Sequence, residues 1–186
     1  MQIDHPFDGL SHTLVPASGP INSKYLFVGE SPGFEEDQAV PPRPFIGKSG
    51  QEFDRLYLPM ALLRRREVRV TNVLPFHPIN NRNPTVDEIK FFNHFLQDDI
   101  AASKPEFIIP MGYFATRYFL GDVDLGNTHG MLHRNKRYPN VAIIPTYHPA
   151  AGLHNTDTQA LIAYDFQQIR LALEGKLPER PVDQFP

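Results

Sequence analysis

The segment between Lys24 and Gly50 constrains the fold more than any other part of the sequence. It opens with the apolar run YLFV at residues 25–28, which is rich in β-forming residues and too short for a helix, so we predict a buried strand. The turn GESPG at 29–33 follows, and its glycines permit close backbone approaches. A second glycine-containing loop covers residues 43–50, where Ser49 is placed to cap a helix. Each loop alone is typical of an ordinary turn, but the two together after one strand favour a ligand site.

Length and composition set the class of protein that we expect. At 186 residues the chain can bury a sizeable core, and we expect residues 1–186 to form a single domain with loop-like termini at 1–23 and 175–186. No apolar run approaches membrane-spanning length and no signal-peptide pattern occurs, so we expect a cytoplasmic protein with no membrane partner. The net charge of −3 argues against coating nucleic acid by bulk charge, although it allows a local basic face.

Strand patterns alternate with helix patterns along the rest of the chain. We predict further strands at 68–73, 107–110 and 141–144, and helices at 51–63, 85–103, 112–120 and 156–174. Pro59 predicts a kink or an early stop in the first helix, and the arginines at 64–66 are expected to close it. Thr85 and Glu88 have capping-box spacing. We therefore expect an α/β fold, a three-layer α/β/α sandwich with a central four-stranded parallel sheet.

Polar side chains follow three of the predicted strands. Glu30 comes after the first strand, Asn72 ends the second and His148 comes after the fourth. Because the carboxyl ends of parallel strands meet at one edge of a sheet, we expect one crevice, with Phe45 beside it. The aromatic ring could stack on a planar ligand, the amide could read its donors and acceptors, and the imidazole could donate to an oxyanion. Each residue could also have an ordinary structural role, as a solvated carboxylate, a turn cap, a loop histidine or a core phenylalanine.

Two weaker patterns lie in the region 121–139, which we expect to be a polar hairpin or loop. His129 and His133 have the spacing of metal ligands, but no third ligand is evident, so we expect them to face solvent. The basic residues Arg134, Lys136 and Arg137 could contact a DNA backbone or could only solubilise the hairpin. We predict no metal site.

Four blocks of the sequence resemble the uracil-DNA glycosylase superfamily, and most of all its family 4, the iron–sulfur uracil-DNA glycosylases. The blocks are VGESPGFEED, RPFIGKSGQEFD, TNVLPFHPINNRNP and PTYHPAAGL, and the resemblance spans roughly Lys24 to Leu173. It implies a monofunctional DNA glycosylase that hydrolyses the N-glycosidic bond of deoxyuridine, releases uracil and leaves an abasic site. The implied partner is DNA containing uracil, and we expect a monomer.

The resemblance also implies roles for the matched residues. Glu30 is expected to orient water or stabilise the cationic sugar, and His148 to stabilise the uracil O2 anion. Phe45 is expected to stack on the base and Asn72 to read its edge, while Glu36 excludes a thymine methyl group. Further substrate contacts are assigned to Gly29 and Ser31. Contacts to DNA are assigned to Gly47, Lys48, Ser49 and Arg82, and to Leu153 as an apolar wedge for base flipping.

The chain departs from the family 4 pattern at the cluster ligands. It has no cysteine, which excludes iron–sulfur ligation by thiolates within the chain. The family's cysteine positions fall on Phe76 and near Phe92. We therefore expect no iron and no other cofactor, with the two rings as an aromatic plug. The alternative is a remodelled segment in which both are ordinary residues.

A second departure is the segment 37–43, which is about two residues longer than usual and has Pro42 where the family prefers glycine. We expect it to border the methyl-excluding side of the pocket. A glycosylase for another modified base is therefore an alternative, and so is a non-catalytic DNA-binding or protein-binding module. A nucleotide-binding α/β protein is disfavoured because neither a GxGxxG nor a Walker lysine motif occurs.

Overall fold

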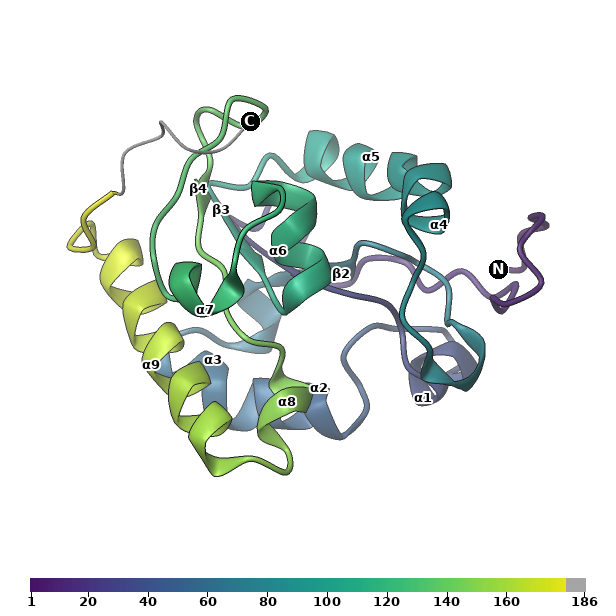
Figure 1. Ribbon diagram of the computed structural model, residues 1–186, viewed down its shortest axis with the longest axis horizontal. Helices are drawn as coiled ribbons and strands as arrows, with labels where there is room; N and C mark the ends of the chain where they lie inside the picture. The colour runs from purple at the N-terminus through teal and green to yellow at the C-terminus, as the bar shows by residue number, and fades with distance from the viewer. Residues whose placement is uncertain (180–186) are drawn as a thin grey trace.

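A parallel sheet of four strands forms the centre of the protein (Figure 1). The computed structural model describes residues 1–179, and the rest of the predicted C-terminal loop, 180–186, lies outside the described residues. The strands are β1 (Tyr25–Gly29), β2 (Arg69–Asn72), β3 (Phe107–Pro110) and β4 (Ala142–Ile143), in the order β2-β1-β3-β4. All three pairings are parallel, as predicted.

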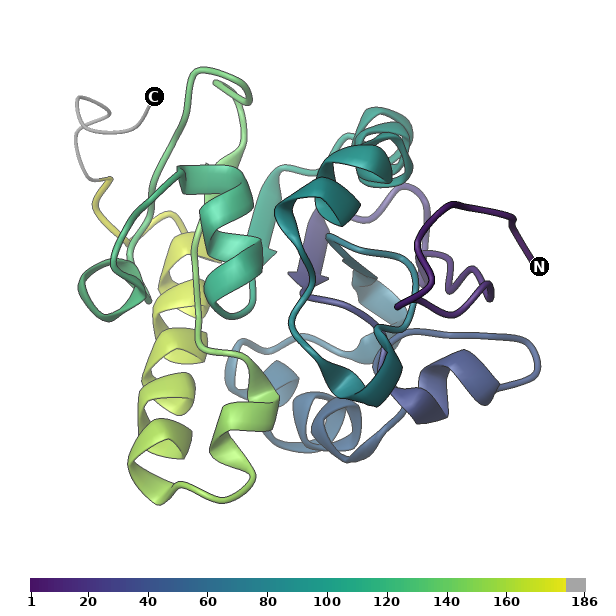
Figure 2. The same cartoon turned by 45° about the vertical axis from the view of Figure 1, so that its right-hand side comes forward.

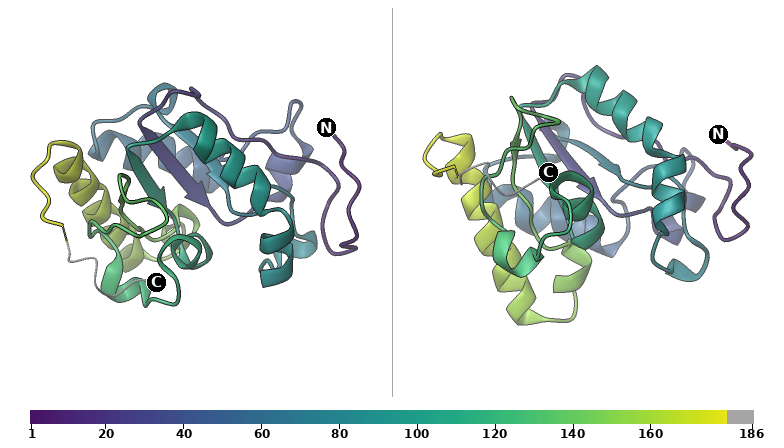
Figure 3. Two further views of the ribbon diagram at one scale, coloured as in Figure 1. Left: turned by 90° about the horizontal axis from the view of Figure 1, so that it is seen from above. Right: turned by 45° about the horizontal axis from the view of Figure 1, so that its top comes forward.

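Helices cover both faces of this sheet (Figures 2 and 3). One face is covered by α4 (Val86–Phe91), α5 (Asn93–Ser103) and α6 (Tyr113–Leu120). The other is covered by α2 (Lys48–Glu52), the π-helix η1 (Phe53–Tyr57), α3 (Leu58–Met60) and α9 (Thr156–Leu173). The connections contain α1 (Phe34–Gln38), α7 (Leu125–Thr128), α8 (Pro149–Gly152) and the 3-10 turns η2 (Arg65–Glu67) and η3 (Ile79–Asn81). The predicted three-layer α/β/α sandwich is confirmed.

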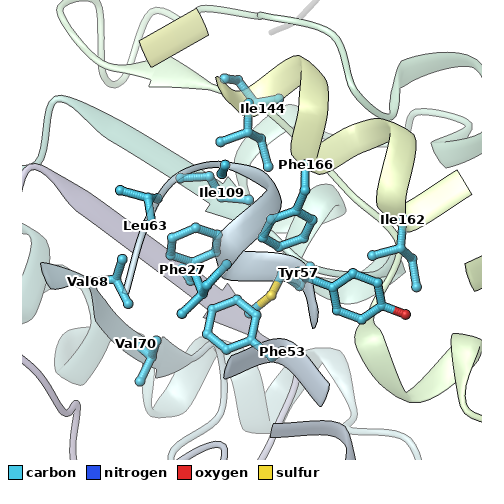
Figure 4. Packing of buried hydrophobic residues seen from close by; sticks show 14 of the residues in the cluster. Phe27, Phe53, Tyr57, Leu63, Val68, Val70, Ile109, Ile144, Ile162 and Phe166 are labelled. Carbon is cyan, nitrogen blue, oxygen red and sulfur yellow. The ribbon is translucent and has the colours of Figure 1, made fainter. Parts of the chain in front are cut away.

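Alternation along β1 explains why the sheet has an apolar core on each face. Phe27 points to the face of α9, where its ring centroid lies 5.1 Å from that of Phe53 and 6.0 Å from that of Phe166 (Figure 4). Leu26 and Val28 point to the opposite face and pack among side chains of α5 and α6. Because successive side chains of a strand point to opposite faces, an apolar run without polar interruption indicates a strand buried on both sides.

The helix predicted at 51–63 differs from the structure at both ends. It begins at Lys48 with Gly47 as the N-cap, so the prediction that Ser49 caps it is wrong. It stops at Met60, directly after Pro59, and Leu62 then takes a φ of +59°. The arginines at 64–66 therefore do not close this helix, and instead lie at the separate turn η2. The early stop predicted from Pro59 is confirmed.

The later helices follow the predictions more closely. The Thr85 hydroxyl accepts a hydrogen bond from the Glu88 N–H at 3.2 Å, and the Glu88 carboxylate accepts one from the Thr85 N–H at 2.8 Å, which confirms the capping box. Phe92 leaves helical geometry, with φ −92° and ψ 7°, and divides the predicted helix 85–103 into α4 and α5. The region 121–139 contains α7 and otherwise forms loops, as expected apart from that short helix.

Two loops pair with the outer strands of the sheet. Ser18 pairs with Val70 of β2 through two backbone hydrogen bonds of 2.9 and 2.8 Å. On the other side, His133 pairs with Ile143 of β4 through two bonds of 2.8 and 2.9 Å. Both pairings are antiparallel. The N-terminal loop, predicted only to be irregular, therefore completes one border of the sheet.

The N-terminal loop also covers a third apolar cluster, which contains Leu10, Leu14, Leu74, Phe76 and Phe92. Phe76 is 0 % exposed and Phe92 is 2 % exposed, and their ring centroids lie 4.5 Å apart. The prediction that both rings are buried core residues is confirmed. Among the described residues, no helix combines the length and the apolar character that crossing a membrane requires.

Candidate functional site

The carboxyl edge of the sheet holds a cavity of about 570 Å³. The loops that follow β1, β2 and β4 meet there, and they bring Phe45, Asn72 and His148 together as the sequence predicted. Its other lining residues are Ser31, Gly33, Phe34, Glu35, Glu36, Gly47, Lys48, Ser49, Asn81, Ala150 and Leu153. Glu30 lines an adjoining hollow of about 210 Å³, which shares Ser31 and His148 with the cavity.

Gly29, the last residue of β1, explains how closely the aromatic ring approaches the strand. A Cβ atom at this position would lie 2.7 Å from Cζ of Phe45 and would also collide with the Asn72 amide oxygen. Gly29 is also the register partner of Asn72 on β2. Glycine is therefore required here because the ring and the amide both pack against the bare backbone.

Phe45 itself has a φ of +60°, a conformation that non-glycine residues seldom adopt. Its ring is 5 % exposed, and its centroid lies 5.8 Å from that of His148. Two charged side chains hold the neighbouring peptides. The Glu36 carboxylate accepts hydrogen bonds from the Ile46 N–H at 3.2 Å and from the Gly33 N–H at 3.0 Å. Burial raises the pKa of Glu36, and these backbone N–H donors oppose that shift.

Arg65 holds the other side of Phe45. Its Nη2 donates to the Pro44 carbonyl at 3.0 Å, and its Nη1 lies 3.5 Å from the Asp54 carboxylate. Burial lowers the pKa of Arg65, and Asp54 opposes that shift. Sequence reasoning missed this residue because it lies within a run of three arginines, and nothing in the run indicates which one turns inward. Glu36 and Arg65 together support the strained conformation of Phe45.

Asn72 presents its amide to the cavity from the end of β2. The residue is 6 % exposed. Its side chain makes no hydrogen bond to any residue in the part of the chain that the structure describes. Because the amide faces the cavity and has no partner from the described part of the protein, the site is suited to a ligand that supplies a donor and an acceptor.

His148 is the N-cap of α8, and its ring is held in one tautomer. Nδ1 accepts a hydrogen bond from the Ala150 N–H at 3.2 Å, so the proton of a neutral ring lies on Nε2. Burial lowers the pKa of His148 to about 4, which keeps the ring neutral at pH 7. The site therefore contains an uncharged N–H donor.

Glu30 is partly buried, and burial raises its pKa above the ordinary value for a glutamate. In the adjoining hollow it lies beside His148 and Ser31. A carboxylate that is poorly solvated interacts more strongly with a positive charge that develops next to it.

The residues assigned to DNA divide into two groups. Gly47, Lys48, Ser49 and Leu153 line the main cavity, and Leu153 follows α8 directly. Arg82 lines the adjoining hollow, where its guanidinium pairs with the buried Glu88 carboxylate and donates to the Gly9 carbonyl at 3.0 Å. Arg82 thus joins α4 to the N-terminal loop, and its contact with DNA stays a prediction.

The segment 37–43 does not reach the main cavity. None of the residues that line the cavity belongs to it, and Val40 within it is 97 % exposed. The expected border with the methyl-excluding side of the pocket is therefore not found. Glu36, the residue before this segment, does line the cavity.

The two histidines of the 121–139 region do not face solvent, so that expectation was wrong. His133 is 2 % exposed, and its Nε2 lies 3.2 Å from the Thr128 carbonyl. His129 Nδ1 lies 2.6 Å from the fully buried Asp165 carboxylate, which also accepts a hydrogen bond from Thr146 at 2.8 Å. Among the described residues no group of three or more His, Cys, Asp or Glu side chains could hold a metal.

The residues at the expected cluster positions do not fit an iron–sulfur cluster. The chain has no cysteine, and Phe76 and Phe92 are packed against each other. Phenylalanine offers no atom that could ligate iron. Whether the two rings occupy the space of a cluster stays a prediction.

Comparison with known proteins agrees with this fold. Residues 16–170 match the family described as the uracil DNA glycosylase superfamily, and the chain belongs to that superfamily. Within it, the chain is 32 % identical over 168 residues to a type-4 uracil-DNA glycosylase of Saccharolobus solfataricus, covering 87 % of this chain and 77 % of that protein. It is 33 % identical over 169 residues to the type-4 enzyme of Sulfurisphaera tokodaii, covering 87 % and 76 %. The type-4 enzyme of Thermotoga maritima is 32 % identical over 146 residues, covering 78 % and 74 %.

Proposed function

We propose that this protein is a monofunctional uracil-DNA glycosylase, which hydrolyses the N-glycosidic bond of deoxyuridine in DNA and leaves an abasic site. The observation that carries the proposal is the single cavity in which an aromatic face, an amide and a neutral imidazole N–H meet. Family membership and the names of the type-4 relatives support the same reaction. We also propose that residues 1–186 act as one domain, as a monomer and in the cytoplasm.

Binding of the base follows from three side chains. The flipped uracil would stack on Phe45, whose ring is fixed by Gly29 beneath it and by the clamped peptides on either side. The Asn72 amide has both a donor and an acceptor, which match the O4 and N3–H groups on the uracil edge. Cytosine has a donor where uracil has O4 and an acceptor where uracil has N3–H. Its polar groups would therefore not pair with the same Asn72 amide, which selects for uracil.

The chemistry then requires separation of charge. As the bond from C1′ to N1 breaks, its electron pair moves to the uracil ring and the sugar becomes cationic. The Nε2–H of His148 donates to the uracil O2 as negative charge develops there. The Glu30 carboxylate stabilises the sugar cation and orients a water molecule, whose oxygen bonds to C1′ while its proton leaves to Glu30 or to solvent.

Contacts with the DNA would come from the residues around the mouth of the cavity. Backbone N–H groups and hydroxyls of Ser31 and the 47–49 turn would contact the flanking phosphates, with Lys48 supplying positive charge. Leu153 would fill the space that the flipped nucleotide leaves in the stack. Glu36 lines the cavity next to the loop that carries Phe45, and its side chain would leave no room there for the methyl group of thymine.

A strand-scission assay tests this proposal. An end-labelled oligonucleotide with one uracil is incubated with the protein and then treated with alkali, which cleaves at abasic sites. We expect cleavage at the uracil position and free uracil by mass spectrometry, on a single-stranded or a duplex substrate. Cytosine, thymine and a panel of modified bases at the same position test selectivity. Absence of scission on every uracil substrate, relative to an incubation without protein, would refute the proposal.

A further inference from the structure

Phe34 is an aromatic side chain to which the proposed function assigns no role. It is the first residue of α1 and is 62 % exposed, yet it lines the same cavity as Phe45 and His148. A large exposed aromatic ring at the mouth of a pocket gives up the free energy of burial, and such residues often mark a binding surface. Sequence reasoning did not single out this phenylalanine, although it lies within the first matched block.

The ring of Phe34 packs against the ring of His77. Its centroid lies 6.2 Å from that of His77, at an interplanar angle of 70°. His77 is 6 % exposed, and its Nδ1 donates to the Pro32 carbonyl at 2.9 Å. The edge-on contact with a buried, hydrogen-bonded ring restricts Phe34 while leaving most of its surface accessible to a ligand.

The helix that carries Phe34 is also held in place. Glu36 binds the Gly33 N–H and the Ile46 N–H, and so ties α1 to the Phe45 loop. The Asp37 carboxylate accepts a hydrogen bond from Ser11 of the N-terminal loop. The two aromatic residues of the cavity, Phe34 and Phe45, are therefore connected through one carboxylate, and a ligand meets them in a preorganised arrangement.

Charge indicates which part of a nucleic acid would contact the ring. Glu35, Glu36 and Asp37 follow Phe34 directly, so phosphates are disfavoured on this side of the cavity. Lys48 also lines the cavity, but the Glu35 carboxylate lies beside Gly47 in the same turn, so a carboxylate partly offsets this positive charge. A neutral, flat nucleobase is the part of a DNA strand that suits an exposed ring beside carboxylates.

We propose that Phe34 stacks on an unpaired nucleobase next to the target nucleotide. The inference rests on the proposed function, because it assumes that the strand enters the cavity between the loops. It adds a binding site for a second base, outside the uracil pocket, on the strand that carries the uracil. Such a site would favour single-stranded or locally opened DNA, in which the neighbouring base is free to leave its stack.

A double-mutant cycle on binding tests this site. The probe is a single-stranded oligonucleotide with 2′-fluoro-deoxyuridine, whose glycosidic bond resists hydrolysis, and affinity is measured by fluorescence anisotropy. We expect Phe34→Ala to weaken binding by about 5- to 150-fold, the range that a stacked base contributes. An abasic analogue is then placed next to the uracil, on its 5′ side or on its 3′ side. On one of these two sides it should weaken wild-type binding as much as Phe34→Ala does, and it should not weaken binding by Phe34→Ala any further.

Matched controls separate stacking from a general loss of apolar surface. Phe91→Ala removes another exposed ring, 52 % exposed on α4 and outside the cavity, and should leave affinity unchanged. Phe34→Trp should retain binding, whereas Phe34→Leu should lose most of it, because leucine has no π face. The inference would be overturned if the losses of affinity from Phe34→Ala and from the abasic analogue were additive. It would also be overturned if Phe34→Ala bound the probe within twofold of the wild-type affinity. A wild-type dimer that Phe34→Ala dissociates would also overturn it, since a second copy would then cover the ring.

The binding cycle can fail or succeed independently of the proposed glycosylase activity. It needs no catalysis, so coupling between Phe34 and the neighbouring base would stand even if wild-type protein released no uracil. Conversely, uracil release with no coupling would remove the stacking site and leave the glycosylase activity in place.

Discussion

Truncation of Phe76 tests whether an aromatic plug stabilises this protein. The ring is fully buried, and its centroid lies 4.5 Å from that of Phe92, 5.0 Å from that of His5 and 6.0 Å from that of Phe95. Large-to-small changes of buried phenylalanine cost about 3–5 kcal/mol, and the cost rises when the surroundings cannot close the hole. Because three rings pack against Phe76, we place Phe76→Ala in the upper part of that range.

Phe92→Ala should cost less, about 3 kcal/mol, because its neighbour Phe91 is 52 % exposed and can move inward. For a chain of this length each kcal/mol lowers the melting temperature by about 2–4 °C. We therefore expect decreases of about 8–20 °C for Phe76→Ala and about 6–12 °C for Phe92→Ala.

Thermal melts followed by circular dichroism measure both variants, with Phe91→Ala as the control. Phe91 has the same chemistry and adjoins Phe92, but it is 52 % exposed, so we expect a decrease of only a few degrees. Iron analysis of the wild type accompanies the melts, and we expect none because the chain lacks cysteine. Stoichiometric iron, or melting temperatures unchanged by both truncations, would refute the plug.

Three further predictions concern the reaction. His148→Ala should lower the rate of base release by about two to three orders of magnitude in single-turnover assays and change DNA affinity little, because the Nε2–H acts mainly on charge that develops in the transition state. Arg65→Ala should weaken substrate binding because the Phe45 ring is no longer held in place, and Arg65→Lys should retain part of the affinity. If Arg65→Ala lowered the melting temperature but left the affinity unchanged, Arg65 would have only a structural role. The rate should fall as the pH decreases through the raised pKa of Glu30, since protonation removes the carboxylate charge. His148, with its pKa lowered to about 4, stays neutral over most of this pH range and does not cause the decrease. If the Glu30→Gln variant still lost activity at acidic pH, Glu30 would not be the group that titrates.

Local sequence patterns predicted the features whose causes are local. The apolar run at 25–28 and the glycine after it identified β1 and its tight turn, since a strand buried on both faces needs such a run. Thr85 and Glu88 identified a helix start because both partners of the capping box lie within one turn. Asn72 and His148 could be assigned to one crevice, because parallel strands bring their carboxyl ends together.

Features that depend on distant contacts were not predictable in this way. The inward turn of Arg65 depends on the Pro44 carbonyl, 21 residues earlier in the chain, and no local pattern distinguishes it from the arginines beside it. His133 is buried because it pairs with Ile143 and contacts the Thr128 carbonyl, whereas its polar surroundings in the sequence suggested an exposed loop. The helix also breaks at Phe92, whose ring packs against Phe76, and helix propensity gave no signal for this break.

The pairing of Ser18 with Val70 and of His133 with Ile143 has a consequence for the behaviour of the protein at high concentration. An outer strand with free N–H and C=O groups can recruit a strand from another molecule, which leads to aggregation. Here a loop residue occupies backbone groups on each outer strand of the sheet. Deletion of residues 1–18 would therefore expose the border of β2 to other molecules. The N-terminal loop thus protects the folded protein against edge-to-edge association.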